Sequence, residues 1–369
     1  MRQLMLGNQA FARGLYEAGC CVASSYPGTP STEVTEEAAK YDEIYCEWAP
    51  NEKVAMEVAF GASLAGKRSF CGMKHVGLNV AADPLYTCSY TGVNAGMVIC
   101  VADDAGMHSS QNEQDSRHHA IAAKVPMLEP SDSAEAYHFV KRAFELSEEF
   151  DTPFIVKMCT RVSHSQSIVD TGERVMPEPK KYEKNIAKYV MMPGNAIRRH
   201  PIVEERTRKL TAFAEHCEFN RVEMGDTSIG IITSSTCYQY VKEVFGDKAS
   251  VLKLGMINPL PEKLILDFAS KVDKLVIVEE LDPIIENHCR QLGLEVSGKD
   301  LFPLEGEISQ NMVAQKLGVA LNEKKKLDEA LPARPPVMCA GCPHRGLFYT
   351  LSKNKCTVLG DIGCYTLGA

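Results

Sequence analysis

The sequence predicts an α/β protein built on parallel β-sheets. Segments with the helical period alternate with short apolar segments through residues 1–170, which is typical of a parallel sheet. Residues 96–103 form an unbroken apolar run, as expected for a strand covered on both faces. With 369 residues, the chain is longer than one ordinary hydrophobic core accommodates, so we expect two or three domains.

The first domain is expected to span residues 1–170. Its predicted helices cover residues 9–17, 31–40, 52–65 and 133–150, and its predicted strands cover residues 20–24, 44–48, 69–74, 96–103 and 153–158. Gly19 is suited to end the first helix, because glycine readily adopts the left-handed conformation found there. Thr29 followed by Pro30 has the residue types of a helix N-cap and first turn, and a capping role alone would account for Thr29.

Glu52 lies where a predicted strand passes into a predicted helix. The apolar stripe of that helix is expected to contain Val54, Val58, Ala62 and Ala65. A carboxylate is favourable at a helix N-terminus, so Glu52 could serve only the helix dipole. Alternatively, it lies at the carboxyl edge of a parallel sheet, where α/β proteins bind their ligands.

A polar loop, residues 103–119, follows the buried strand. Loops in this position often carry function. The loop contains side chains that could bind a metal, namely Asp103, Asp104, His108, His118 and His119, but their spacing matches no standard metal-site pattern. We therefore favour a substrate-facing loop over a metal site.

A second α/β domain is expected over residues 226–325. Residues 171–225 contain several prolines and many charges without a sustained period, which indicates a linker with a helix at 204–216. The predicted strands that follow are 228–233, 251–254 and 274–279, and the predicted helices are 238–245, 261–272 and a segment after Pro283. This domain has no glycine-rich phosphate loop and no obvious catalytic group, so we expect a structural role.

Composition excludes several classes of function. The net charge of −8 argues against a nucleic-acid partner, and the basic clusters 198–200 and 324–326 look like exposed linker. No run of 18 apolar residues exists, so no membrane span is expected. The apolar region at the N-terminus is too short for a signal peptide, and we therefore expect a cytoplasmic location. Fourteen cysteines in such a chain indicate reduced thiols and a possible metal or cluster site.

A proline-rich stretch, residues 331–336, leads to a cysteine-containing segment. Cys339 and Cys342 form a C-x2-C pair, and Cys364 follows. With a fourth thiolate they would suit zinc or an iron–sulfur cluster, although unligated structural cysteines remain an alternative. Cys356 lies in an apolar run that is typical of a core strand, where free cysteine is often buried. The segment 332–369 is too short for its own core, so we expect the chain to be a fragment of a longer protein.

Several motifs together resemble one enzyme family. They are LGNQA at 6–10, YPGTPS at 26–31, NEK at 51–53, GMHSSQNE at 106–113, CAGCPHR at 339–345 and GDIGC at 360–364. In this order, the chain resembles the thiamine-diphosphate-dependent 2-oxoacid:ferredoxin oxidoreductases, and among them the alpha subunits that act on indole-3-pyruvate. The resemblance covers essentially the whole chain.

The resemblance implies a fold and an activity. Residues 1–170 would be a pyrimidine-binding domain, 226–325 a transketolase C-terminal-like domain, and 332–369 the start of a pyrophosphate-binding domain. The expected reaction is oxidative decarboxylation of an aryl-2-oxoacid to its acyl-coenzyme A, with electrons passed to ferredoxin. The expected cofactors are thiamine diphosphate, Mg2+ and [4Fe-4S] clusters, and the expected partner is a smaller beta subunit in a hetero-oligomer.

The resemblance also assigns site residues. Glu52 would be the catalytic glutamate that hydrogen-bonds the cofactor's aminopyrimidine. Thr29, Arg117 and His108 would contact the substrate, and Thr29 and Arg117 would bind its carboxylate. Gly28 would line the cofactor site, where its small size is consistent with an aryl substrate.

Cys339, Cys342 and Cys364 match cluster ligands of the family. The motif that holds Mg2+ and the diphosphate is absent, as is the ferredoxin-like cluster module, so this chain alone is expected to be inactive. Two alternatives stay open: a non-catalytic binding subunit with a zinc-stabilised C-terminal segment, and an oxidoreductase of the same family that acts on another 2-oxoacid.

Overall fold

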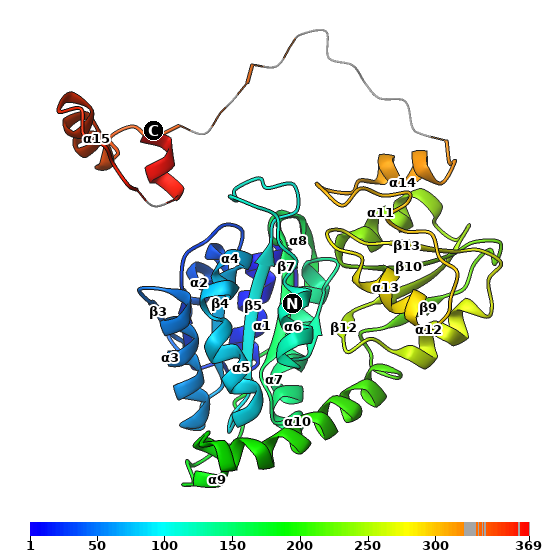
Figure 1. The fold of residues 1–369 in the computed structure, drawn as a ribbon, viewed down its shortest axis with the longest axis horizontal. Helices are drawn as coiled ribbons and strands as arrows, with labels where there is room; N and C mark the ends of the chain where they lie inside the picture. The colour runs from blue at the N-terminus through cyan, green and yellow to red at the C-terminus, as the bar shows by residue number, and fades with distance from the viewer. Residues whose placement is uncertain (321–329, 331, 334, 336, 361, 369) are drawn as a thin grey trace. The chain divides into compact units, whose positions relative to one another are not determined.

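Two large β-sheets with mostly parallel strands organise residues 1–320 of the computed structural model (Figure 1). The structure describes residues 1–320, 330, 332–333, 335, 337–360 and 362–368. Residues 321–369 form a separate unit, described on its own below. The basic cluster 324–326, Asp361 and parts of the proline-rich stretch lie outside the described residues.

The first sheet has seven strands in the order β12-β6-β7-β5-β4-β2-β3. Their bounds are β2 Val22–Ser25, β3 Tyr45–Trp48, β4 Ser69–Lys74, β5 Met97–Asp103, β6 Met127–Leu128, β7 Phe154–Cys159 and β12 Met256–Asn258. Neighbouring strands are parallel, except that β12 runs antiparallel to β6. The carboxyl ends of the parallel strands therefore meet at one edge, which is where such sheets bind ligands.

Helices cover both faces of this sheet. One face carries α1 Gly7–Glu17, α2 Thr32–Ala38, α7 Ser133–Phe150 and α8 Thr160–His164, and the other carries α3 Glu52–Leu64, α4 His75–Val80, α5 Ala82–Thr91 and α6 Arg117–Ala123. Because both faces are covered, β4 and β5 are buried along their whole lengths.

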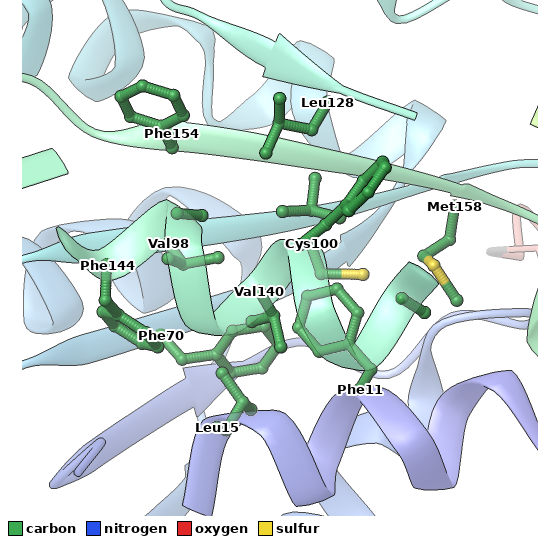
Figure 2. Close-up of a cluster of buried hydrophobic side chains, with 14 of the residues drawn as sticks. Phe11, Leu15, Phe70, Val98, Cys100, Leu128, Val140, Phe144, Phe154 and Met158 are labelled. Atoms are coloured by element: carbon green, nitrogen blue, oxygen red, sulfur yellow. The ribbon is translucent and has the colours of Figure 1, made fainter. Parts of the chain in front are cut away.

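The core between α1, α7 and the sheet is apolar (Figure 2). Phe11 and Leu15 of α1 and Phe144 of α7 belong to one buried cluster with Phe70 of β4 and Val98 of β5. All five side chains are 0% exposed. Full burial of such a side chain contributes about 1.5–3 kcal/mol. This packing holds the two helices on the sheet and thereby fixes the loops at its edge.

The second sheet has four strands in the order β13-β10-β11-β9. Its strands are β9 Arg221–Glu223, β10 Gly230–Ser234, β11 Ser250–Leu254 and β13 Leu275–Val278, and its helices are α11 Ser235–Phe245, α12 Glu262–Ala269, α13 Ile284–Gln291 and α14 Gln310–Lys316. Only β9 runs antiparallel to its neighbour. The predicted α/β fold with parallel sheets is thus confirmed.

β12 joins the two sheets. It follows β11 in the chain but pairs with β6 of the first sheet, with Met256 opposite Leu128. The hydrophobic cluster behind this pairing contains Ile155 from the first sheet together with Ile232 and Leu254 from the second. The segment expected to be a separate second domain therefore shares a core with the first.

A long helix, α10 Pro193–Ala214, forms within the predicted linker and runs along one end of this unit (Figure 1). A short helix, α9 Ile186–Tyr189, precedes it. The sequence predicted only residues 204–216 as helix, because Pro201 and the many charges obscured the helical period. Tertiary contacts override that weak local preference.

Two buried arginines hold α10 against α5. Arg199 donates to the Tyr90 carbonyl oxygen at 2.7 Å, and Arg206 donates to the Ser89 carbonyl oxygen at 2.8 Å. The Tyr90 and Ser89 carbonyls lie near the C-terminus of α5, where a cation is favourable. The prediction that residues 198–200 form an exposed linker is therefore wrong for Arg199.

The buried face of α3 differs from the predicted apolar stripe. Ala55, Met56, Ala59 and Ser63 are buried against the sheet, whereas Val54 and Val58 are only partly buried. Small side chains on the buried face let the helix lie close to β2 and β4. The predicted stripe was displaced by one position, because both the predicted and the buried sets of residues recur with the helical period and the residue types alone do not tell them apart.

Two strands at the ends of the first domain were not predicted. β1 Arg2–Leu6 pairs antiparallel with β8 Gln166–Asp170. This pairing connects the N-terminus to the end of the first domain.

Residues 337–360 and 362–368 contain α15 His344–Lys353 and a short 3-10 helix, Gly363–Gly368. The core strand predicted at residues 356–359 is wrong: the segment has no regular secondary structure and is exposed, with Leu359 99% exposed. A strand needs a partner, and none of the described residues pairs with it. Across the described residues, no helix is both long and apolar enough to cross a bilayer.

Candidate active site at the carboxyl edge of the first sheet

The strands β5, β4, β2 and β3 are neighbours, and each passes into a candidate functional segment at the same edge. β2 leads to the loop with Gly28 and Thr29, and β3 leads to Glu52. β4 ends at Lys74, and β5 leads to the polar loop of residues 104–116. The topology therefore gathers the predicted site segments, apart from the cysteines, at one place.

Glu52 is the first residue of α3. Asn51 caps the helix, since its side chain accepts a hydrogen bond from Val54 N at 3.0 Å. Glu52 is only 9% exposed, and burial raises the pKa of its carboxyl group. Within the described residues it forms no ion pair. A residue serving only the helix dipole would be favoured as the anion, whereas burial here favours the neutral acid, as in a general acid or base.

Gly77 of α4 packs directly against Glu52. A Cβ atom at position 77 would lie 2.5 Å from Glu52 Oε1 and 2.7 Å from its Cδ. Both distances are too short for van der Waals contact, so only glycine lets α4 approach the carboxyl group this closely. The sequence alone did not single out Gly77.

The loop of residues 26–31 is not organised by Thr29. α2 begins at Thr32, whose hydroxyl accepts a hydrogen bond from Gly28 N at 2.8 Å, and Ser31 donates to the Gly28 carbonyl oxygen at 2.8 Å. The prediction that Thr29 and Pro30 cap this helix is therefore wrong. Thr29 is exposed and free of the capping role, so the local explanation for it falls away.

Asn8 supports this loop from α1. Its side-chain amide donates to the Pro30 carbonyl oxygen at 2.8 Å and to Glu33 Oε2 at 3.1 Å, and Asn8 is buried. The motif at 6–10 contains Asn8, but only the structure shows that its contact is with the loop that carries Thr29.

Asp103 and Asp104 are occupied by hydrogen bonds. Asp103 accepts from the backbone and side chain of Ser116, and Asp104 accepts from Ser109 N at 2.8 Å and from the hydroxyls of Ser110 and Thr160. Of the described residues, the set of three possible metal ligands that gathers is instead Asp115, His118 and Asp282. Asp115 is already paired with Arg117, so we assign no metal there.

His108 lies in the outer part of the loop. Its Nε2 atom is 3.0 Å from Glu307 Oε1, and Glu307 also pairs with Arg161 at 2.6 Å. Glu113 of the same loop accepts a hydrogen bond from Gly306 N at 3.0 Å. The loop after β5 is therefore attached to the segment that precedes α14.

Arg117 is buried in a network of ion pairs. Its guanidinium contacts Asp115 at 2.6 Å and Glu279 at 2.6 Å, and it also donates to the Glu280 and Asp282 carbonyl oxygens. It is 2% exposed. Burial opposes ionisation of Asp115, but Arg117 prevails and lowers the pKa of Asp115 to about 2. The guanidinium is therefore engaged mainly by acceptors within the protein, and a contact between Arg117 and a substrate carboxylate stays a prediction.

Lys74 lies at the same edge, although the sequence did not single it out. It ends β4 and lies between the Gly28 loop and the loop after β5. A Cβ atom on Gly28 would lie 3.0 Å from Lys74 Cβ, and Lys74 Nζ donates to the Ser109 carbonyl oxygen. In the sequence, Lys74 looks like the polar end of a strand.

The candidate cluster ligands lie in the second unit. Cys339 and Cys364 are exposed and Cys342 is partly exposed, and a turn joins Cys342 N to the Cys339 carbonyl oxygen at 3.2 Å. Their sulfur atoms do not gather to ligand distance among the described residues. Cys356, the possible fourth ligand, is also exposed. The donor chemistry fits a cluster or zinc, but this arrangement is not a formed site.

Residues 13–224 match the thiamine-diphosphate-binding domain of the pyruvate flavodoxin/ferredoxin oxidoreductases. The chain belongs to this family. It is 42% identical to the indolepyruvate oxidoreductase subunit IorA of Archaeoglobus fulgidus, over 99% of this chain and 64% of the relative. It is 41% identical to the subunit of the same name from Pyrococcus horikoshii, over 99% of this chain and 62% of the relative. The chain thus spans less than two thirds of these relatives.

Solved structures show the same fold. The 2-oxoglutarate:ferredoxin oxidoreductase from Magnetococcus marinus aligns with a TM-score of 0.73 at 18% identity, covering 86% of this chain and 65% of that one. A split-gene transketolase aligns with a TM-score of 0.53 at 15% identity, covering 85% of this chain and 97% of that one. At these identities the likeness concerns the fold alone.

The residues at the sheet edge fit the cofactor of this oxidoreductase family. Thiamine diphosphate carries an aminopyrimidine ring, which needs a carboxyl group in a dry place for a hydrogen bond. Glu52 offers a largely buried carboxyl group without an ion-pair partner in the described residues, and Gly77 leaves room beside it. His75, the first residue of α4, adds a buried Nδ1 atom that has no partner in the described residues.

Gly77→Ala should weaken thiamine diphosphate binding by roughly 10-fold or more, because the added methyl group must displace the Glu52 carboxyl group from its hydrogen bond to the cofactor, and loss of a buried hydrogen bond costs about 1–3 kcal/mol. Calorimetric titration of the full-length, assembled protein measures the change. Gly61→Ala is the matched control: it lies in α3 with nothing within 4 Å of an added Cβ, so it should leave affinity unchanged and stabilise the helix by about 0.5–1 kcal/mol. Equal affinities in the two variants would contradict the assigned Glu52–Gly77 contact.

Proposed function

We propose that this chain is part of the alpha subunit of an arylpyruvate:ferredoxin oxidoreductase. The reaction is oxidative decarboxylation of an aryl-2-oxoacid such as indole-3-pyruvate to its acyl-coenzyme A, with electrons passed to ferredoxin. Membership in the oxidoreductase family supports the reaction class, and the names of the 42% and 41% identical relatives support the substrate. The observation that carries the proposal is Glu52 at the sheet edge, a buried carboxyl group that forms no ion pair with any residue that the structure describes.

Glu52 is the catalytic residue of this proposal. Bound thiamine diphosphate supplies the nucleophilic carbon and the electron sink for decarboxylation. Glu52 hydrogen-bonds N1′ of the aminopyrimidine and holds a proton there. Because burial raises the pKa of Glu52, the neutral acid that this hydrogen bond requires is accessible.

Two loops contribute to substrate binding. Thr29 is exposed at the edge and has a hydroxyl without a capping role, which suits a contact to the 2-oxoacid. Gly28 beside it leaves space for an aryl group. His108 extends the opposite loop and is held by Glu307, so it can contact the distal part of the substrate.

Cys339, Cys342 and Cys364 are proposed as thiolate ligands of a [4Fe-4S] cluster. Their exposure and the C-x2-C turn support ligation, because an unligated structural cysteine is normally buried. Mg2+ accompanies the diphosphate in this proposal, but we assign it no ligand among the described residues. All fourteen cysteines are free, which supports a reducing compartment such as the cytoplasm.

The test uses the full-length alpha subunit with its beta subunit, purified without oxygen. We expect reduction of ferredoxin that requires indole-3-pyruvate, coenzyme A and thiamine diphosphate, and slower turnover with pyruvate and 2-oxoglutarate. The protein should contain iron and acid-labile sulfide. Stoichiometric zinc without sulfide, together with no reduction by any 2-oxoacid, would favour a non-catalytic binding subunit instead. Faster turnover with another 2-oxoacid would correct the substrate alone.

A further inference from the structure

The site needs a cation that Arg117 does not provide. A 2-oxoacid carries a carboxylate next to its reacting carbonyl, and a dry site binds such an anion with a positively charged donor. The charge of Arg117 is already balanced within the protein by Asp115 and Glu279, and its guanidinium also donates to the Glu280 and Asp282 carbonyl oxygens. Another cation at the edge where Glu52 and Thr29 lie is therefore expected to bind the carboxylate.

Lys74 occupies that edge. It is the last residue of β4, the strand between β2 and β5, and it lies opposite Ala102 of β5 in the sheet. Its side chain lies close enough to Gly28 that an added Cβ there would be 3.7 Å from Lys74 Cδ. The helix that begins directly after Lys74 carries Gly77, which packs against Glu52. Lys74 thus packs beside Gly28 and directly precedes the helix whose Gly77 packs against Glu52.

The ammonium group of Lys74 is only partly satisfied. It is a three-proton donor, and its contact in the described residues is to one acceptor, the Ser109 carbonyl oxygen. It forms no ion pair there, and the nearby Asp104 already accepts from Ser109, Ser110 and Thr160. The other buried lysines differ, since Lys157 pairs with Glu129 at 3.0 Å and Lys253 with Glu135 at 2.6 Å.

An unpaired buried ammonium is costly. Lys74 is 8% exposed, and burial lowers its pKa while Asp104 opposes that effect. Buried charges in proteins are normally paired or bind a ligand. A group that anchored only the Ser109 carbonyl would not need a charge, since a neutral donor would do so at lower cost. The position and the missing partner together indicate an anion that arrives from outside.

We infer that Lys74 binds the carboxylate of the 2-oxoacid. This inference rests on the proposed function and completes its substrate site. The ammonium group contacts the carboxylate, and the Thr29 hydroxyl lies on the neighbouring loop. In this orientation the carbonyl group of the substrate faces the cofactor. Lys74 is therefore a substrate-binding residue, and the Ser109 contact aims its side chain.

The test compares Lys74→Met, which removes the charge but keeps most of the side chain, with Lys74→Arg, which keeps the charge. In the assembled full-length enzyme, Lys74→Met should raise the KM for indole-3-pyruvate roughly 10- to 100-fold. Lys74→Arg should recover part of that loss. Lys67→Met is the matched control, because Lys67 is exposed and precedes β4 at the opposite edge of the sheet. It should leave the KM unchanged.

Two competitive inhibitors separate binding from structural damage. Indole-3-propionate has a carboxylate, and indole-3-propionamide is its neutral counterpart. Lys74→Met should raise the inhibition constant of indole-3-propionate by the same factor as it raises the KM. The inhibition constant of indole-3-propionamide and the affinity for thiamine diphosphate should stay unchanged. If both inhibitors, or the cofactor, weaken equally, Lys74 only supports the loop and the inference is wrong.

Different results would overturn the proposed function and the Lys74 inference. If the wild-type enzyme oxidises no 2-oxoacid, the function is wrong and the inference falls with it. If the wild type is active on an aryl-2-oxoacid and Lys74→Met retains its KM, the function stands and the inference alone is overturned. If Lys74→Met does not fold, the neutral variant Lys74→Gln decides: an unchanged carboxylate-to-amide inhibition ratio in that variant would overturn the inference.

Discussion

Glu52→Gln should lower the turnover of the assembled enzyme by about 100-fold or more, with little change in the KM for the 2-oxoacid. Loss of a positioned acid or base typically costs this much. Glutamine keeps the shape of the side chain but cannot exchange a proton with the aminopyrimidine. Its amide is easier to bury than a carboxyl group whose pKa burial already raises, so the unfolding temperature should not fall. Steady-state ferredoxin reduction and thermal unfolding measure the two effects.

Glu57→Gln is the matched control for this change. Glu57 lies on the exposed side of the same helix, so its variant should retain full turnover. Turnover of Glu52→Gln within a few-fold of the wild type would remove the basis for the thiamine diphosphate site at this edge, whatever the identity of the substrate.

Arg117→Met should destabilise the fold by about 3–5 kcal/mol, the usual cost of removing one member of a buried ion pair. Asp115 and Glu279 would be left buried without their counter-charge. Arg117 connects the helix α6 on the first sheet to the segment after β13. The substitution should therefore lower the free energy of unfolding of residues 1–320 as a whole. Denaturant unfolding of the full-length protein measures the difference in free energy.

The pH dependence of the free energy of unfolding shows whether the loss comes from the buried Arg117–Asp115 ion pair. In the wild type, Arg117 holds the pKa of Asp115 at about 2, so this contribution is present above the ordinary aspartate pKa and is lost as the pH falls from about 4 toward 2. Without Arg117, burial raises the pKa of Asp115, and the variant should lose stability as the pH rises above about 4. Arg208→Met, which breaks an exposed pair with Glu205, should cost at most about 1 kcal/mol at any pH. A similar small, pH-independent loss in Arg117→Met would contradict the network's role.

The sequence predicted the elements that have a strong period or a clear end. The helix at 133–150 and the strand at 69–74 match α7 and β4 residue for residue, because a cap or turn residue marks their ends. The helices α4 and α5 were missed, since glycine and proline interrupt the pattern there. α10 was shortened for the same reason, and only its contacts with α5 show why it forms.

Glu52 was found because its position is local information. A strand followed by a capped helix places the residue at the sheet edge, and the structure adds its burial and the glycine opposite it. The contacts of Arg117, in contrast, could not be predicted from local sequence patterns. Its partner Glu279 is 162 residues away, so no local pattern could show that its guanidinium is occupied. Lys74 is the converse case: that it has no carboxylate partner in the described part of the chain is visible only once its neighbours are placed.

The short strand β12 makes the two sheets a single folding unit. Met256 and Asn258 close the open edge that β6 would otherwise present, and the apolar cluster behind them draws residues from both sheets. Cutting the chain between the sheets would expose unpaired backbone groups and an apolar surface at once, which favours aggregation. We therefore expect the elements that position Glu52, Thr29 and Lys74 to unfold together with the second sheet. Their stability against local unfolding is set by segments far from the site.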